Sequence, residues 1–373
     1  MTSARPALYG AHYTSRRAVL VLNLGSPDSP EVKDVATYLH DFLTDRRVVG
    51  LSRPIRHFLV DRIIIPRRAP RSAENYRTIW DDEEKTFPLI AHTASIADQL
   101  SRQRQCPVAV GMRYGNPSTA EALCALAALP SVEELVIAPL YPHYAQSSYE
   151  TAVAFVLEEL DRLKLRPLKL SLLPAFYDAP EYRSVLADHV REHLPEHFDR
   201  LVVSMHGIPT SHLHKACRAR NGHTSHCLDR RGWHETSAEG DCYRLHSEAT
   251  RHALAEDLSL PQRQVELVYQ SRLGFHPWLQ PYMSRRVGQF ASEGVEHLVV
   301  VCPGFVCDCL ETIQEIDDYY RGRFLSTGGK QFSYIPCLNS SPAFVSALST
   351  LIDKTFADPS CRLSTPIPTK YQY

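Results

Sequence analysis

Short apolar runs alternate with helix-length amphipathic stretches along almost the whole chain of 373 residues. Eight of these runs are rich in Val, Ile and Leu and have the length of buried strands, and strands that alternate with helices form parallel sheets. They are residues 19–24, 108–112, 135–138, 168–173, 201–205, 265–269, 297–301 and 332–335. The chain is too long for one ordinary core. The sequence therefore predicts an α/β protein of two similar Rossmann-like, doubly wound halves, residues 18–175 and 176–355.

Composition and simple motifs exclude several classes of function. Lys and Arg number 41 against 42 Asp and Glu, so the charge of -1 gives no field that would attract nucleic acid. The first 17 residues contain no apolar signal region and nowhere do 18 apolar residues run together, so we expect a cytoplasmic protein. Ten cysteines in a reducing compartment are then expected to be buried thiols or metal ligands. No Gly-rich nucleotide loop has the required spacing.

Three carboxylates near the end of the chain have helical spacing. Glu311, Glu315 and Asp318 stand at i, i+4 and i+7, which places them along one face of an α-helix. Such a row is either an ordinary solvated face or a site that attracts a cation. The buried run at 298–301 leads into this helix through a tight turn. Because open α/β sheets build their sites at the carboxyl ends of strands, this position favours the cation site.

A histidine stands at the end of another buried run. His206 follows the run at 201–205 and precedes Gly207, which together with Pro209 forces a turn. An imidazole at the exit from a strand is more often placed for chemistry than for packing. His206 and the carboxylate row are therefore expected to face each other across one cleft, an arrangement suited to proton abstraction, delivery of a divalent metal, or both.

Two segments break the alternation. Residues 51–71 mix large apolar side chains with six arginines. They form either a core-facing helix with a solvated side or a lip for a hydrophobic ligand or a membrane, which would give peripheral contact with the inner membrane. Residues 210–246 contain Cys217, Cys227 and Cys242 and six of the 18 histidines. This segment is polar, so something other than a core must order it.

Several separate motifs, in order, resemble those of ferrochelatases. They are Leu-Asn-Leu-Gly-Ser-Pro at 22–27, Met-Arg-Tyr-Gly at 112–115, Ser-Met-His-Gly-Ile-Pro at 204–209, Tyr-Gln-Ser-Arg at 269–272, and Pro-Gly-Phe at 303–305 before Cys-Leu-Glu-Thr at 309–312. The residues of the last two motifs are most similar to those of the protoporphyrin-using enzymes of Gram-negative bacteria. The resemblance implies a porphyrin cleft between the two halves. It also implies insertion of Fe(II) into protoporphyrin IX to form protoheme, the last step of heme biosynthesis.

The resemblance also implies roles for single residues. His206 matches the catalytic histidine of the family, and Glu311 matches its iron-binding or proton-handling glutamate, with Glu315 and Asp318 continuing the acidic row. The residues implied to line the porphyrin pocket are Arg113, Tyr114 and Trp278. Metallation removes two pyrrole protons and the hydration shell of the iron. It therefore needs a base, a few weak ligands and an apolar slot.

The cysteine-rich segment departs from the pattern of shorter relatives. Some ferrochelatases hold a [2Fe-2S] cluster, and a subset resembles this chain in carrying internal cysteines. The resemblance implies Cys217, Cys227 and Cys242 as ligands, and we take Cys307 as the fourth. A zinc site made of Cys and His, or free thiols, are the other interpretations.

Other functions stay open at this stage. The chain could be a chelatase for coproporphyrin III with iron, or for a corrinoid precursor with cobalt. It could also be a two-lobed heme-binding or metal-binding protein without turnover. The presence of both His206 and Glu311 argues against the last of these.

Overall fold

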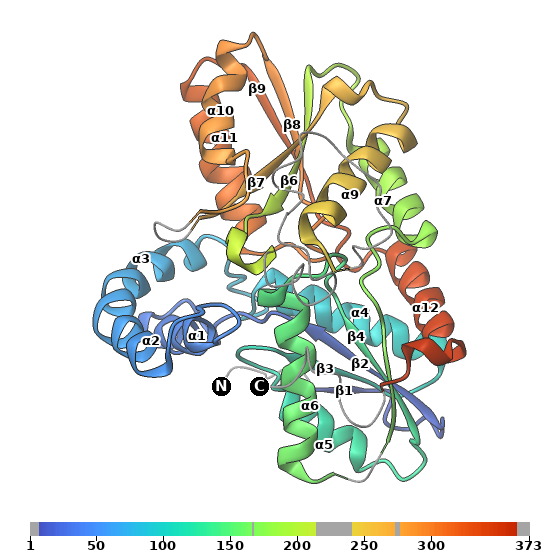
Figure 1. Cartoon of the computed structure of the whole chain (residues 1–373). Coiled ribbons are helices and arrows are strands. Elements are labelled where there is room, and N and C mark those ends of the chain that lie inside the picture. The colour runs from blue at the N-terminus through green and yellow to red at the C-terminus, as the bar shows by residue number, and fades with distance from the viewer. Residues whose placement is uncertain (1–6, 166–167, 214–240, 273–276, 364–373) are drawn as a thin grey trace.

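The computed structural model describes residues 7–165, 168–213, 241–272 and 277–363. It contains a five-stranded sheet in the order β1-β3-β2-β4-β5 and a four-stranded sheet in the order β7-β6-β8-β9 (Figure 1). The strands are β1 (Leu8–Tyr9), β2 (Arg17–Asn23), β3 (Val108–Met112), β4 (Glu134–Pro139), β5 (Lys169–Leu172), β6 (Arg200–His206), β7 (Val265–Gln270), β8 (His297–Val301) and β9 (Gln331–Ile335). The predicted α/β class with two parallel sheets is confirmed.

All eight predicted strands form, and the first four and last four belong to separate sheets. Within each sheet these strands are parallel, with Leu20 of β2 level with Ala109 and Ile137, and Leu201 of β6 level with Val265. Among the strands of the described residues, only β1 runs antiparallel, against β3. It was not predicted, because two residues carry no readable pattern.

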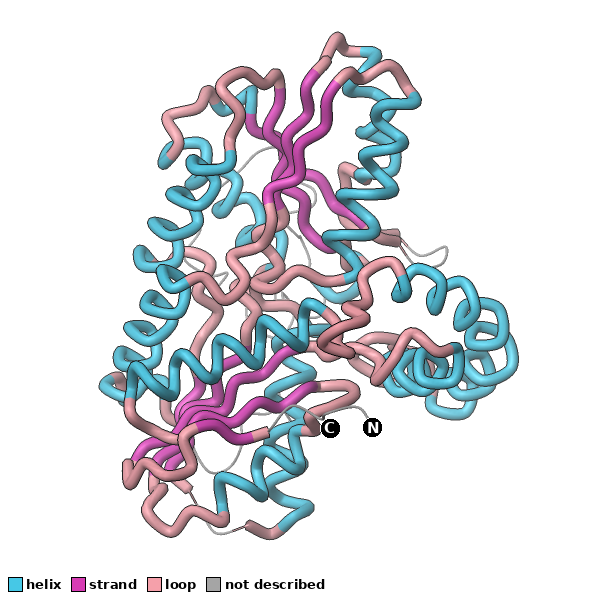
Figure 2. The backbone as a smooth tube through the Cα atoms, turned by 180° about the vertical axis from the view of Figure 1, so that it is seen from behind, coloured by secondary structure: helices cyan, strands magenta, loops and turns pink. Residues whose placement is uncertain are grey.

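Helices cover both faces of each sheet, as a doubly wound fold requires (Figure 2). In the first part of the chain they are α1 (Val32–Thr44), α2 (Arg53–Leu59), η1 (Val60–Ile64), α3 (Ile65–Arg77), α4 (Pro88–Arg104), α5 (Thr119–Ala127), η2 (Gln146–Glu150) and α6 (Thr151–Leu163). In the second part they are α7 (Pro180–His193), α9 (Tyr243–Asp257), η4 (Gln262–Gln264), α10 (Met283–Ser292), η5 (Leu310–Tyr320), α11 (Arg321–Ser326), α12 (Pro342–Ala357) and η6 (Pro359–Cys361). No described helix is both long enough and apolar enough to cross a bilayer.

Successive side chains of a strand point to opposite faces of the sheet, so neighbouring residues pack against different helices. Val19 and Val21 of β2 pack in the buried cluster that contains α4, whereas Leu20 and Leu22 pack in the cluster that contains α5 and α6. All four side chains are essentially inaccessible. Burying an aliphatic side chain of this size contributes about 1.5–3 kcal/mol. The continuous apolar runs thus reflect strands that are covered on both faces.

The last long helix joins the two sheets. Helix α12 packs on α7 and also on α4 and β4, so the chain returns from the second half to the first (Figure 1). One buried cluster accordingly contains Val136 of β4, Val203 of β6 and Leu348 of α12. A shared core of this kind fixes the position of one sheet relative to the other. The division at residues 175 and 176 stays a prediction, since α12 serves both halves.

Helices α1, α2, η1 and α3 project beside the two sheets as a separate lobe, here called the helical lobe (Figures 1 and 2). Its interior is aromatic, with Tyr38 packed edge-on against Tyr76 and Tyr114. Its outer surface is unusual, because Ile55 is 55% exposed and Phe58 is 61% exposed. The 51–71 segment is therefore not simply a core-facing helix with a solvated side.

Candidate active site

A cavity of about 710 Å³ opens where the two sheets and the helical lobe meet. Its volume is in the range usual for small-molecule sites. Its walls come from β6 and the loops after β2, β4, β7 and β8, and from α1, α3 and η5. The side chains that line it include His206, Glu311, Glu315, Trp278, Arg67, Arg68, Arg71 and Phe42. The carboxyl ends of several parallel strands thus form one site, as an open α/β sheet predicts.

His206 is the last residue of β6, and its side chain lines the cavity. Its Nδ1 lies 2.6 Å from the Gly207 carbonyl oxygen, and its own carbonyl accepts a hydrogen bond of 2.8 Å from the Tyr243 hydroxyl. Gly207 must be small here, because a Cβ atom would lie 2.9 Å from the Ser271 carbonyl oxygen. The imidazole is therefore held from its Nδ1 side, and Nε2 is the nitrogen left for chemistry.

A buried glutamine joins the strand ends to the acidic helix. Gln270 ends β7, level with His206, and is completely inaccessible. Its Oε1 accepts a hydrogen bond of 2.7 Å from the Ser204 hydroxyl, and its Nε2 donates to the Glu311 carbonyl oxygen at 2.7 Å. The amide thus connects β6, β7 and η5 through both of its polar ends.

The acidic helix differs from the α-helix that the spacing predicted. Leu310–Tyr320 is a π-helix, in which each turn takes more residues than in an α-helix. Glu311 and Glu315 still line the cavity, together with Gln314 and Tyr319. Asp318 does not line it and is exposed. The expectation of three carboxylates on one face is corrected to two, because i+7 does not return to the same face of a wider helix.

Glu315 is the more tightly held of the two carboxylates. The Ser271 amide N–H donates to its Oε1 at 3.0 Å, and the Ser271 hydroxyl donates to its Oε2 at 2.5 Å. Burial raises the pKa of the Glu315 carboxyl above its usual range, and Glu311 adds to this, while the Ser271 bonds and His206 act in the opposite direction. Glu315 is therefore placed to hold a proton at a pH where a solvated glutamate has lost it.

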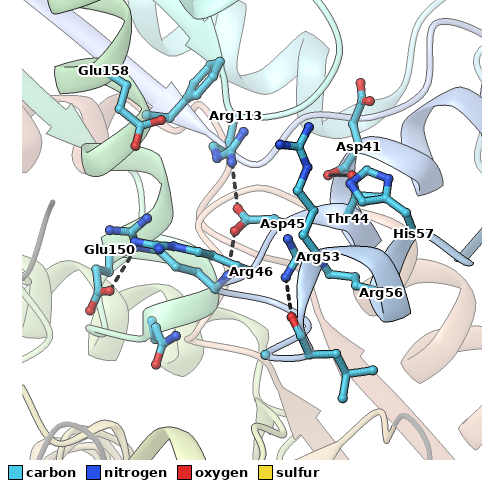
Figure 3. A pocket seen from close by; sticks show the side chains of 15 residues that line it. Asp41, Thr44, Asp45, Arg46, Arg53, Arg56, His57, Arg113, Glu150 and Glu158 are labelled. Carbon is cyan, nitrogen blue, oxygen red and sulfur yellow. Dashed lines mark hydrogen bonds and ion pairs between the residues drawn. The ribbon is translucent and has the colours of Figure 1, made fainter. Parts of the chain in front are cut away.

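Arg113 and Tyr114, expected in the porphyrin pocket, do not line this cavity. The Arg113 guanidinium pairs with Asp45 at 2.6 Å and lines a second pocket of about 920 Å³ (Figure 3). Tyr114 is buried and donates to the same carboxylate at 2.8 Å. Burial acts to raise the pKa of Asp45, but the charge of Arg113 and the hydrogen bonds outweigh it, so the pKa is lowered. Asp45 thus contacts both side chains, through an ion pair with Arg113 and a hydrogen bond from Tyr114.

Trp278, which the resemblance assigns to the porphyrin pocket, lies beside the turn that follows His206. It lines the cavity and pairs with Pro209 across an isolated bridge, and the neighbouring Leu279 amide donates to the Ile208 carbonyl at 3.0 Å. These contacts attach Trp278 to the turn that follows His206. A broad aromatic wall is thus fixed beside the imidazole.

Two of the four predicted cluster ligands lie in the described part of the chain. Cys217 and Cys227 lie outside the described residues. Cys242 is buried at the start of α9, and Cys307 is buried with its Sγ 3.8 Å from the Thr93 hydroxyl oxygen. Burial raises the pKa of the Cys307 thiol to about 12. Both thiols are shielded from water.

Comparison with known proteins identifies the family. The family model described as Ferrochelatase matches residues 16–356. The ferrochelatase of Porphyromonas gingivalis is 44% identical over 345 residues, which cover 91% of this chain and 96% of that protein. This chain belongs to the ferrochelatase family. The ferrochelatase of Opitutus terrae is 39% identical over 341 residues, which cover 90% of this chain and 96% of that protein.

A solved structure agrees with the fold. SirB from Bacillus subtilis with Fe3+ superposes with a TM-score of 0.50 at 10% identity, and the match covers 92% of this chain and 97% of that one. The two-domain chelatase fold is thus confirmed. As a ferrochelatase, the protein is an enzyme that inserts iron into a porphyrin for heme synthesis, and Fe(II) and porphyrin are its substrates. The interpretation as a binding protein without turnover is set aside.

Sequence reasoning gave no role to several residues of the site. Gln270 and Ser271 follow an apolar run just as His206 does, and that shared position was a usable signal. The cavity-lining arginines of α3 lie in the 51–71 segment, whose pattern left two interpretations open. Gln314 and Tyr319 had no signal, because their orientation depends on the π-helix.

The raised pKa of Glu315 predicts a pH-dependent change in stability. An ordinary glutamate has a pKa of about 4.3. Above that pH the unfolded chain loses a proton that the folded site keeps, so the free energy of unfolding falls as pH rises toward the pKa of the folded state. Glu315→Gln removes this titration. We expect the free energy of unfolding of the variant, minus that of the parent, to become more positive between about pH 4 and about pH 8 in urea titrations.

Glu196→Gln is the control, because Glu196 is 91% exposed. The difference between Glu315→Gln and the parent is expected to change with pH by more than the difference between this control and the parent. Equal changes for the two variants would contradict the assignment.

Proposed function

We propose that this ferrochelatase converts protoporphyrin IX and Fe(II) to protoheme in the cavity between the sheets, with His206 and Glu311 as its catalytic residues. The observation that carries the proposal is that His206, from the end of β6, and Glu311, from η5 after β8, line the same cavity. A base and a carboxylate at one porphyrin-sized slot are the groups that metallation requires.

His206 accepts the pyrrole protons in this proposal. Its Nδ1–H is directed at the Gly207 carbonyl, so the lone pair of Nε2 is available to take a proton or to contact the incoming iron. Two protons leave the porphyrin for each iron that enters. Glu311 and Glu315 form the route by which these protons depart, and the raised pKa of Glu315 suits it to receive one. Weak oxygen and nitrogen contacts let the iron pass on to the four pyrrole nitrogens.

The arginines of α3 are proposed to bind the propionates of the porphyrin. Arg67, Arg68 and Arg71 line the cavity. Burial, and then the charge of Arg71, lower the pKa of the Arg68 guanidinium. Carboxylates placed beside these side chains would offset that mutual repulsion. The cationic rim therefore fits the two propionates of one edge of protoporphyrin IX.

Protoporphyrin is proposed over coproporphyrin because of the α1 wall. Leu39, Phe42 and Leu43 line the cavity, together with Val48 from the following turn. Coproporphyrin III carries four propionates, and burying a carboxylate against such a wall would be costly. The vinyl groups of protoporphyrin are apolar and fit it.

Replacing the catalytic residues tests the proposal. We expect His206→Ala to lower the rate of metallation by about 100-fold or more, because a general base typically contributes that much. The affinity for porphyrin, measured by the quenching of tryptophan fluorescence, should change little, since the apolar slot remains. Glu311→Gln should be comparably damaging, and Glu315→Gln milder.

His197→Ala is the matched control, because His197 is 92% exposed. If His206→Ala keeps its rate within about tenfold of the parent, the role of the base is wrong. Equal losses at Glu311 and Glu315 would show that the two carboxylates act as one unit.

We also propose a [2Fe-2S] cluster held by Cys217, Cys227, Cys242 and Cys307. When bound, a cluster would tie together a polar segment that cannot build its own core. Cys242 and Cys307 lie in the described part of the chain, and both are shielded from water. Tyr243, directly after Cys242, donates to the His206 carbonyl, so order in the segment is linked to the catalytic strand end.

The cluster predicts a coloured protein. Anaerobically purified enzyme should absorb beyond the protein band, bleach on reduction, and contain two irons and two acid-labile sulfides per chain. Cys227→Ser should lose the colour and melt at a lower temperature, while Cys124→Ser, at an exposed thiol, should keep both. Stoichiometric zinc without sulfide in the purified protein would contradict the cluster and indicate a zinc site.

Finally, we propose that the helical lobe is the lip that contacts the cytoplasmic face of the inner membrane, where an apolar porphyrin can enter. Ile55, Phe58 and Ile63 are exposed on α2 and η1. Arg53 and Arg62 lie on the same short helices. Apolar side chains flanked by cations suit an anionic bilayer surface.

Vesicle flotation tests the lip. The parent should float with vesicles that contain phosphatidylglycerol and should be released by high salt. Phe58→Glu should float much less. Leu325→Glu, which changes an exposed leucine of α11, should float like the parent. Equal flotation of the two variants would contradict the lip.

A further inference from the structure

Three metal-binding side chains meet on the helical lobe, outside the catalytic cavity. They are His40 of α1, His57 of α2 and Asp61 of η1. One ligand atom from each lies within 4.8 Å of the other two. Across the described parts of the chain, no other group of three His, Cys, Asp or Glu side chains meets this distance. None of the three lines the cavity of His206 and Glu311.

The spacing is close to that of a metal site. Metal–nitrogen and metal–oxygen distances of about 2.0–2.2 Å in a tetrahedron separate neighbouring ligand atoms by about 3.4 Å. The His40 Nε2 and Asp61 Oδ1 atoms are already 3.3 Å apart. The two imidazole rings are 5.9 Å apart between centroids and tilted by 54°. Because His40 and Asp61 are partly exposed, small side-chain rotations can close the remaining distance.

A second carboxylate orients the first histidine. His40 Nδ1 lies 3.3 Å from Asp41 Oδ1, on the ring edge opposite to Asp61. A metal-binding histidine usually donates its other ring N–H to a carboxylate in this way, which fixes the tautomer and leaves Nε2 for the metal. His57 and Asp61 are four residues apart along α2 and η1, and Asp41 and His57 lie at one edge of the second pocket (Figure 3).

We propose that His40, His57 and Asp61 bind a divalent first-row transition ion such as Zn2+, with water completing the coordination. Two imidazoles and one carboxylate favour such ions over Mg2+ or Ca2+, which prefer oxygen ligands, and over Cu(I), which prefers sulfur. The ion would join α1 to α2 and η1. Helix α1 also carries Leu39 and Phe42, which line the catalytic cavity. Metal occupancy of this site would therefore stiffen one wall of the porphyrin slot.

Zinc binding to the full-length enzyme tests the site. Zinc bound elsewhere on the protein cancels when each variant is compared with the parent. Equilibrium dialysis with Zn2+ alone should find one equivalent fewer on His57→Ala and on Asp61→Asn than on the parent. His252→Ala is the matched control, because His252 forms a surface pair with Glu256 at 3.3 Å. It should retain the stoichiometry of the parent. Added Zn2+ should raise the melting temperature of the parent more than that of His57→Ala.

A second readout guards against misfolding. Circular dichroism and metal-free melting should be alike for the parent and Asp61→Asn, since Asn conserves shape. Co2+ should give visible absorption bands on the parent that weaken in both site variants. Unchanged zinc stoichiometry and cobalt spectra in both variants would overturn the proposal and leave His40 and Asp61 as a plain ion pair.

Discussion

The side chain of Gln270 joins two walls of the cavity, the end of β6 and the start of η5. One end of its amide accepts from Ser204 inside β6, and the other end donates to the Glu311 carbonyl at the start of η5. Because the side chain is fully buried, water cannot replace either of these partners, and only longer contacts remain, from Nε2 to Glu315 Oε2 at 3.4 Å and from the Cys302 thiol to Oε1 at 3.5 Å. The strand that ends in His206 and the helix that carries Glu311 are thus joined through one residue.

The surrounding structure supports this link from both sides. Parallel pairing puts His206 and Gln270 level at the same sheet edge, so the imidazole and the amide lie beside each other at the strand ends. The start of η5 is held separately by Asp308, which accepts hydrogen bonds from the Thr312 hydroxyl at 2.9 Å and the Asn339 amide at 2.7 Å. A carboxylate wall fixed at its first turn can present Glu311 without rearrangement, which suits a reaction that depends on placement.

The sequence could predict the parts of the fold that repeat a simple period. All eight main strands, the split into two sheets, and the strand-end position of His206 followed from apolar runs and turn residues. The π-helix could not be predicted, because carboxylates at i and i+4 lie on one face of either kind of helix, and only the position at i+7 separates the two. Asp318 was consequently assigned to the wrong face.

A motif gives the position of a residue, but packing decides the orientation of its side chain. Arg113 and Tyr114 follow β3 as the motif implies, and the buried carboxylate of Asp45, a residue without any sequence signal, accepts a hydrogen bond from each. The return of α12 to the first sheet is equally invisible in a local pattern, because it depends on contacts between distant segments.

The rate of metallation by Gln270→Met tests the central link most directly. Methionine keeps a similar volume and removes every hydrogen bond of the amide, including the longer contact with Glu315, while the residues His206 and Glu311 are not themselves replaced. Anaerobic assays with Fe(II) and protoporphyrin IX, well below the melting temperature of the variant, should show kcat reduced about tenfold or more, with porphyrin affinity near that of the parent. A kcat equal to that of the parent would show that the two walls do not depend on this amide.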